Sequence, residues 1–130
     1  MSDFISVLKE ADDFIAVTGA DEEKILLAEE ILGLTFSEEY KKYLAEFGAA
    51  CANGHEFTGI INSERLDVVS VTKNAKANNH QIGEGQYVVE KLDIDGILIL
   101  QDADGIVYEA NEVTAPVKIF DSLFEYMVTE

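Results

Sequence analysis

Apolar residues recur at helical spacing in the first third of the chain. One apolar stripe is formed by Phe4, Val7, Leu8 and Ala11. This spacing predicts a first helix. A second helix is predicted to begin at the capping-box-like pair Thr18 and Asp21 and to end at Gly33, which suits a left-handed C-cap. Its buried side is expected to carry Ile25, Ala28, Ile31 and Leu32.

A third helix is predicted between Ser37 and Gly48. Ser37 offers an N-cap, and the acidic pair Glu38 and Glu39 suits the positive end of the helix dipole. The apolar side repeats at i, i+3, i+4 and i+7 through Tyr40, Tyr43, Leu44 and Phe47. Gly48 is expected to end this helix.

Beyond Gly48 the apolar period changes to that of strands. Strands are predicted at 56–61 and 66–71, followed by a short polar helix from Thr72 to a loop at 78–80. Three β-branched and aromatic runs in 86–110, separated by turns at 95–96 and 102–105, predict an antiparallel meander. The run 97–100 is apolar on both faces, so it is placed centrally. A last helix is predicted to open with a capping box formed by Ser122 and Glu125.

These elements predict one α+β domain over residues 1–130. Its expected architecture is a mainly antiparallel sheet packed by the N-terminal helices and the C-terminal helix. A chain of 130 residues with 48% hydrophobic residues and one Pro is long and apolar enough to bury one core. Splitting it further would leave two marginal pieces.

Charge narrows the classes of partner. The 26 Asp and Glu against 9 Lys and Arg give a formal net charge of −17. Direct binding of nucleic acid or of an anionic membrane face requires clustered Lys and Arg, so neither is expected. Residues 1–47 carry a net −8, residues 48–83 are neutral and residues 84–130 carry a net −9. The acidity therefore lies in two stretches around a neutral middle.

The same sequence features indicate the compartment. No stretch approaches the roughly 20 apolar residues of a membrane-spanning helix, and the N-terminal residues do not resemble a secretion signal. The lone Cys51 cannot form an internal disulfide, which fits a reducing compartment. The cytoplasm is the expected location.

Candidate chemistry is sparse. The runs 93–96 and 102–105 begin like calcium loops, but the second has Ile106 and Val113 at two ligand positions, so both are interpreted as hairpin turns. Cys51, His55 and His80 are too few for a closed zinc site, and a buried structural thiol is favoured over a Cys51–His55 nucleophile and base. A catalytic pair of carboxylates like that of glycosidases stays possible. Because acidic residues are so numerous in this chain, their presence does not indicate such a pair. No catalytic residue, metal or cofactor is predicted.

The order and spacing of motifs from about Thr18 to Met127 are similar to those of a known superfamily. The residues that carry the resemblance are Glu22-Glu23-Lys24-Ile25, Ala28-Glu29, Leu32-Gly33-Leu34, Phe36, Glu38, Tyr40-Lys41, Tyr43-Leu44, Phe47-Gly48, His55-Glu56-Phe57-Thr58-Gly59-Ile60, Val68, Thr72, Tyr87-Val88-Val89, Asp95-Gly96-Ile97, Gly105, Tyr108, Ser122-Leu123 and Glu125-Tyr126. The chain resembles the SUKH superfamily, SMI/KNR type, which is shared by the fungal cell-wall glucan synthesis regulator and bacterial immunity proteins. Ser37 stands where that family commonly has Pro, and either residue suits a helix start.

The resemblance implies an α+β fold and a binding role without catalysis. Bacterial members are typically immunity proteins that occlude a cognate polymorphic toxin, often a nuclease. A chain at −17 would be steered to the basic cleft of such an enzyme. The contact residues are predicted among acids near the meander turns, which were expected to be dense and exposed: Glu84, Glu90, Asp93, Asp95, Asp102 and Asp104.

Three other interpretations stay open. The acidity could serve solubility alone. The domain could regulate or scaffold a housekeeping protein, as the fungal relatives are thought to do. A small hydrolytic enzyme would require a deep pocket with convergent polar groups. The sequence does not indicate an oligomeric state.

Overall fold

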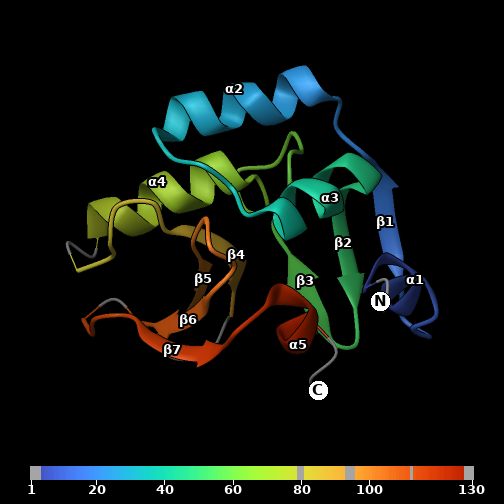
Figure 1. Cartoon of the computed structure of the whole chain (residues 1–130). Coiled ribbons are helices and arrows are strands. Elements are labelled where there is room, and N and C mark those ends of the chain that lie inside the picture. Colours follow the sequence, from blue (N-terminus) through green and yellow to red (C-terminus); the bar gives the residue numbers. More distant parts are fainter. Residues whose placement is uncertain (1–3, 79–80, 93–95, 112, 128–130) are drawn as a thin grey trace.

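The computed structural model describes residues 4–78, 81–92, 96–111 and 113–127 (Figure 1). Helices and strands alternate irregularly along the chain. The elements are α1 (Phe4–Lys9), β1 (Ile15–Thr18), α2 (Glu22–Leu32), α3 (Glu38–Glu46), β2 (Phe47–Ala52), β3 (His55–Phe57), α4 (Val68–Asn78), β4 (Tyr87–Lys91), β5 (Leu98–Gln101), β6 (Val107–Ala110), β7 (Val117–Phe120) and α5 (Leu123–Met127). The predicted α+β class is confirmed.

The strands form one sheet in the order β1-β2-β3-β4-β5-β6-β7, and every neighbouring pair is antiparallel. The predicted meander corresponds to β4, β5 and β6. Its register is set by pairs such as Val88 with Leu100 and Leu100 with Tyr108. Leu98, Ile99 and Leu100 are buried, as expected for a central strand. The edge strands β1 and β7 were not predicted.

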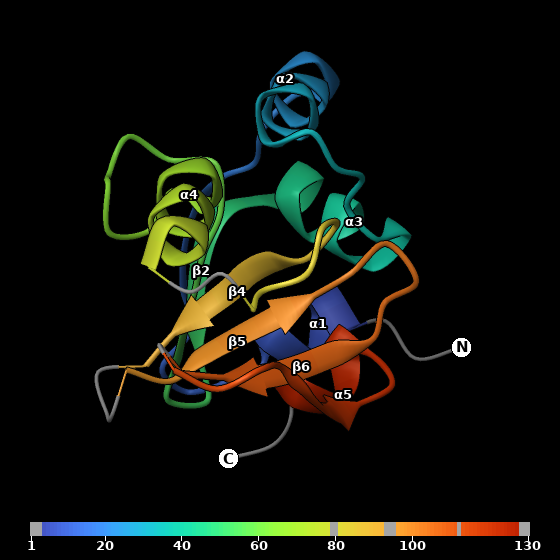
Figure 2. The ribbon, with the colours of Figure 1, turned by 90° about the vertical axis from the view of Figure 1, so that its left-hand side faces the viewer.

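Helices pack around this sheet in an uneven arrangement. Helix α4 packs on β4 and α3 on β2, while α2 contacts mainly α3 and α4. Figure 2 shows α2 almost end-on, outside the layer that α3 and α4 form. The short helices α1 and α5 contact each other, well away from α2. Helix α2 is therefore the outermost element on its side of the molecule.

Local capping chemistry fixes the ends of α2 and α3. The Asp21 carboxylate accepts the Lys24 N–H at 2.9 Å, and Gly33 ends α2 with φ 68°. The Ser37 hydroxyl accepts the Tyr40 N–H at 2.9 Å. The caps at Ser37 and Gly33 are as predicted. The predicted capping box of Thr18 and Asp21 is wrong, because Thr18 belongs to β1 and Asp21 is itself the N-cap. Helix α3 ends at Glu46, because the next residue already starts β2.

The region around α4 differs from the sequence prediction. Residues 66–71 are not a strand, and the helix begins at Val68 rather than at Thr72. The cause is Asp67, whose carboxylate accepts the Ser70 N–H at 3.2 Å and so caps the helix. The sequence prediction of a strand rested on the β-branched residues that form the first turn of this helix. The buried positions of α4 follow a helical period: Val68, Val71, Thr72 and Ala75.

The core between α3 and the meander is aromatic and contains a buried polar network. Tyr87 packs edge-on against Phe36, with ring centroids 4.8 Å apart. Its hydroxyl accepts the Ser37 N–H at 2.9 Å and donates to Gln101 Oε1 at 2.8 Å. Because Ser37, Tyr87 and Gln101 are all buried, these hydrogen bonds satisfy polar groups that would otherwise be costly to desolvate.

Candidate partner-binding site

The strand register places three of the predicted acidic residues at one end of the meander. Tyr87 pairs with Gln101, and Gln101 pairs with Val107. The loop before β4 and the β5–β6 loop therefore lie at the same end of the sheet, which brings together Glu84, Asp102 and Asp104. The predicted residues Asp93 and Asp95 lie outside the described residues.

Glu90 does not have the exposed position that the prediction requires. It is only 2% exposed. Strand β4 is covered on both faces, since its neighbours Val88 and Val89 are both fully buried. The β4–β5 register also shifts between Val88 and Glu90. The Glu90 side chain contacts Tyr126 in the main core. A buried carboxylate cannot contribute to a surface that contacts a partner.

Three donors surround the buried Glu90 carboxylate. His55 Nδ1 lies 2.9 Å from Oε1, the Glu56 N–H donates to Oε2 at 2.8 Å, and the Tyr126 hydroxyl donates to Oε1. Since a carboxylate only accepts hydrogen bonds, Nδ1 carries the hydrogen of the His55 ring. The ring also packs on Phe57, with centroids 5.3 Å apart. Glu90 therefore links β3, β4 and α5 and has a structural role.

Asp102 shapes the β5–β6 turn. Its Oδ1 accepts the N–H groups of Asp104 at 3.0 Å and Ile106 at 3.2 Å, and its Oδ2 accepts the Tyr108 hydroxyl at 2.7 Å. This hydrogen bond is the main cause that raises the pKa of Tyr108. Half-buried and bonded within the turn, Asp102 mainly orders its own loop. The hairpin interpretation of residues 102–105 agrees with this geometry.

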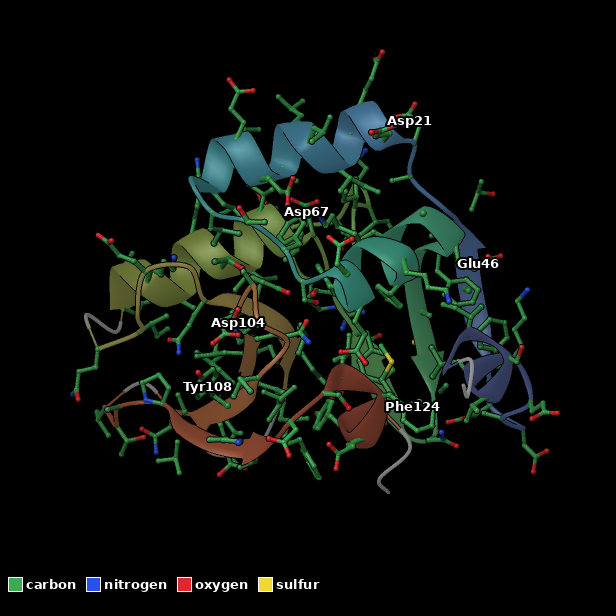
Figure 3. The ribbon with its side chains drawn as sticks, viewed as in Figure 1. Asp21, Glu46, Asp67, Asp104, Tyr108 and Phe124 are labelled. Atoms are coloured by element: carbon green, nitrogen blue, oxygen red, sulfur yellow. The ribbon has the colours of Figure 1, made fainter. Side chains whose placement is uncertain are left out.

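Of the predicted acids that the structure describes, Glu84 and Asp104 are exposed. Figure 3 shows Asp104 beside Tyr108 on the meander, far from Asp21 at the start of α2. Burial lowers the pKa of Lys76 on α4, and the charge of Glu84 acts in the opposite direction. These two acids can attract a cationic partner from a distance, but they form no contiguous surface with Glu90.

The residues considered for chemistry have other roles in the structure. Burial, followed by the negative charge of Glu56, raises the pKa of the Cys51 thiol. A protonated thiol is a poor nucleophile. The Arg65 guanidinium donates two hydrogen bonds to the Glu56 carboxylate, one of them at 3.0 Å. These hydrogen bonds lower the pKa of Glu56. Among the described residues, no cluster of three or more His, Cys, Asp and Glu could hold a metal ion.

Sequence reasoning missed an apolar surface on α2. Ile31 was expected to be buried but is 47% exposed, and Leu26 and Leu27 are each 54% exposed. In α2 only Ile25 and Ala28 are buried. The signal in the sequence was the run Ile25-Leu26-Leu27, which is too wide for one buried stripe.

The fold and its surfaces define a small α+β domain with exposed acidic and apolar patches and a sheet of seven antiparallel strands. The family model SUKH_5, described as SMI1-KNR4 cell-wall, matches residues 1–129. The chain belongs to this SUKH family, as the sequence motifs predicted. No curated protein matches it significantly. Within the part of the chain that the structure describes, no helix is long and apolar enough to cross a membrane.

Proposed function

We propose that this chain is a cytoplasmic immunity protein that binds a cognate polymorphic toxin and blocks it without catalysis of its own. The observation that carries the proposal is the match to a SUKH family over residues 1–129, since the superfamily includes immunity proteins. The toxin is a protein whose active cleft the chain occludes.

The net charge supports a nuclease as the toxin. A nuclease that grips phosphates presents a basic cleft, and a protein with a net charge of −17 is attracted to it over several ångströms. Exposed acids such as Glu84 and Asp104 contribute to that attraction. Charge of this kind raises the association rate more than it raises the final affinity.

Co-expression tests this function directly. The toxin domain encoded beside the gene for this chain is produced in cells with and without the chain, and growth and complex formation are measured. The proposal expects restored growth and a complex that survives gel filtration. Finding neither rescue nor a complex would count against an immunity function.

A second candidate is a regulatory or scaffolding domain that binds a housekeeping protein. It is favoured by the description of the matched family, SMI1-KNR4 cell-wall. A gene neighbourhood without a toxin reading frame, together with a stable complex with a cell-wall protein, would support this alternative.

A further inference from the structure

Helix α2 presents three large aliphatic side chains to solvent. Leu26 and Leu27 are each 54% exposed and Ile31 is 47% exposed. Leu27 and Ile31 are one helical turn apart and so form a continuous stripe. We refer to these three residues as the α2 ridge. A single exposed aliphatic residue is ordinary, whereas a group on the outermost helix is typical of an interaction site.

A shallow groove runs along one side of the ridge. It has a volume of about 220 Å³ and lies between α2 and the start of α4. Leu27 and Ile31 form one wall, and Ile60 and Val69 contribute the other. The lining is largely aliphatic, with Lys24 and Asp67 also contributing. An apolar side chain from a partner would be removed from water there, which favours binding.

A second depression lies between α2 and α3, on the other side of the ridge. It has a volume of about 590 Å³ and is lined by Leu26, by the carboxylates of Glu22 and Glu38, and by Lys41 and Lys42 of α3. The ridge thus separates an apolar groove from a more polar one. A partner that straddles α2 would meet aliphatic groups at the centre and charged groups at the margin, which is the usual anatomy of a protein interface.

The charges around the ridge are mostly negative. Glu22, Glu23 and Glu30 on α2 are exposed, and Asp21 precedes them at the N-cap. The basic residues beside the ridge are Lys24 on α2 and Lys41 and Lys42 on α3. Since the acids of α2, its N-cap and Glu38 outnumber these lysines, the margin keeps a negative charge and complements a cationic surface. The acids at the meander turns differ, because Asp102 is bonded within its own loop and Glu84 and Asp104 can mainly attract from a distance.

We propose that the α2 ridge is the docking surface for a cationic protein partner that places apolar side chains in the groove between α2 and α4. The assignment rests on the proposed function, and it names the surface through which the toxin is held. The acidic residues near the meander turns then speed the encounter, and α2 supplies the contacts that slow dissociation.

Charge argues against a second copy of this chain as the occupant. Two copies meeting through α2 would place Glu22, Glu23 and Glu30 close to the same acids of the other copy. Each chain also carries a net charge of −17. Juxtaposed like charges at an interface disfavour association. A basic surface removes this repulsion, and a second copy adds to it.

The ridge is tested with neutral substitutions that leave the charge of α2 unchanged. The variants are Leu27→Ser and Ile31→Ser, each alone and combined. Val117→Ser on the edge strand β7 is the matched control, since Val117 is also an exposed aliphatic residue, at 65%. Thermal unfolding of each variant is measured first, and small changes are expected because these side chains are already half in water.

Two probes are used with each variant. The first is the toxin domain encoded beside the gene, whose Kd is measured by calorimetry. The second is a synthetic amphipathic helical peptide made of Leu and Lys, which presents apolar and cationic groups without any toxin fold. The double variant is expected to lose at least about 30-fold in Kd for the toxin, the size of a binding hot spot, while Val117→Ser keeps the original affinity.

The outcomes separate the surface from the function. If the toxin binds the parent chain and the double variant equally well, the α2 ridge is not the docking surface, although the immunity function stands. If the toxin does not bind the parent chain, the immunity function fails. The surface assignment then stands only if the peptide binds the parent chain and the double variant binds the peptide at least tenfold more weakly. A parent chain that dimerises while the double variant is monomeric would assign the ridge to a second copy and overturn the proposal.

Discussion

The buried Glu90 carboxylate provides a quantitative test of the structure. Its three donors come from His55, from the backbone of Glu56 and from Tyr126 on the last helix. Replacement by Ala removes every acceptor at once. The Tyr126 hydroxyl and the Glu56 N–H are then left without this partner in a region that excludes water, since Glu90 and Tyr126 are both buried.

The expected cost follows from the number and kind of interactions lost. A hydrogen bond to a charged group contributes about 1.5–3 kcal/mol, and these contributions do not add fully for a shared acceptor. Each buried donor that is left without an acceptor costs about 1–3 kcal/mol, and this variant leaves more than one such donor. Glu90→Ala is therefore expected to lower the free energy of unfolding by about 3–5 kcal/mol. Glu90→Gln keeps one acceptor oxygen and should lose about 1–3 kcal/mol.

Urea unfolding followed by far-UV circular dichroism measures both variants. Glu109→Gln is the matched control, because Glu109 pairs with the same residue of β5 as Glu90 but is exposed. The control should change stability by less than about 0.5 kcal/mol. If Glu90→Ala costs no more than the control, Glu90 is not a buried acceptor and the description of this cluster is wrong.

Three further predictions concern the fold. The Glu39 carboxylate accepts the first two N–H groups of α5 at 2.6 and 2.8 Å, so Glu39→Ala should cost about 1–2 kcal/mol and increase amide exchange in α5. A Cβ at Gly59 would collide with the carbonyl oxygen of Gly48, so Gly59→Ala should cost at least about 2 kcal/mol in urea unfolding, whereas a neutral effect would refute this close approach. Burial raises the pKa values of Tyr40, Tyr43 and Tyr87, so these tyrosines hold their protons more tightly when folded. The contribution of these protonated tyrosines to the stability of the fold is complete below the ordinary tyrosine pKa of about 10 and is lost at higher pH. Circular dichroism and tyrosinate absorbance should therefore change together as the pH rises. Ionisation of these tyrosines without unfolding would contradict their burial.

The parts of the fold that local chemistry determines were predictable from sequence. The N-cap Ser37 and the C-cap Gly33 act within one helical turn, so their residue types suffice to identify them. The start of α2 was placed at Thr18 instead of at the N-cap Asp21. The meander was equally clear, because its apolar runs and turns are contiguous. The start of helix α4 was not predicted correctly, because the β-branched residues in its first turn are typical of a strand and the cap at Asp67 was not recognised.

The features that depend on tertiary packing were not predictable. Strand β1 has four residues and leaves Ile15 exposed at the sheet edge, so its sequence carries no alternating signal. Glu90 is buried because helices cover both faces of β4, and a charged residue in the sequence gives no sign of such cover. Ile31 is exposed because α2 lies outside the layer of α3 and α4 (Figure 2).

Tertiary packing also changes which residues make up the candidate partner-binding site. Acids are dense near the meander turns in the sequence, but the structure buries Glu90 and bonds Asp102 within its own loop, while Asp93 and Asp95 lie outside the described residues. Exposed Glu84 and Asp104 remain as charges that can attract a partner. The apolar contacts that hold a partner are assigned instead to α2, which sequence periodicity had treated as an ordinary amphipathic helix.

The most direct measurement of the central claim is toxin neutralisation in cells. The toxin domain encoded beside this gene is expressed with the chain or with an empty vector, and surviving colonies are counted. An immunity protein predicts survival with the chain and death without it. Equal killing in both cases, with the chain present at a normal level, would contradict the account.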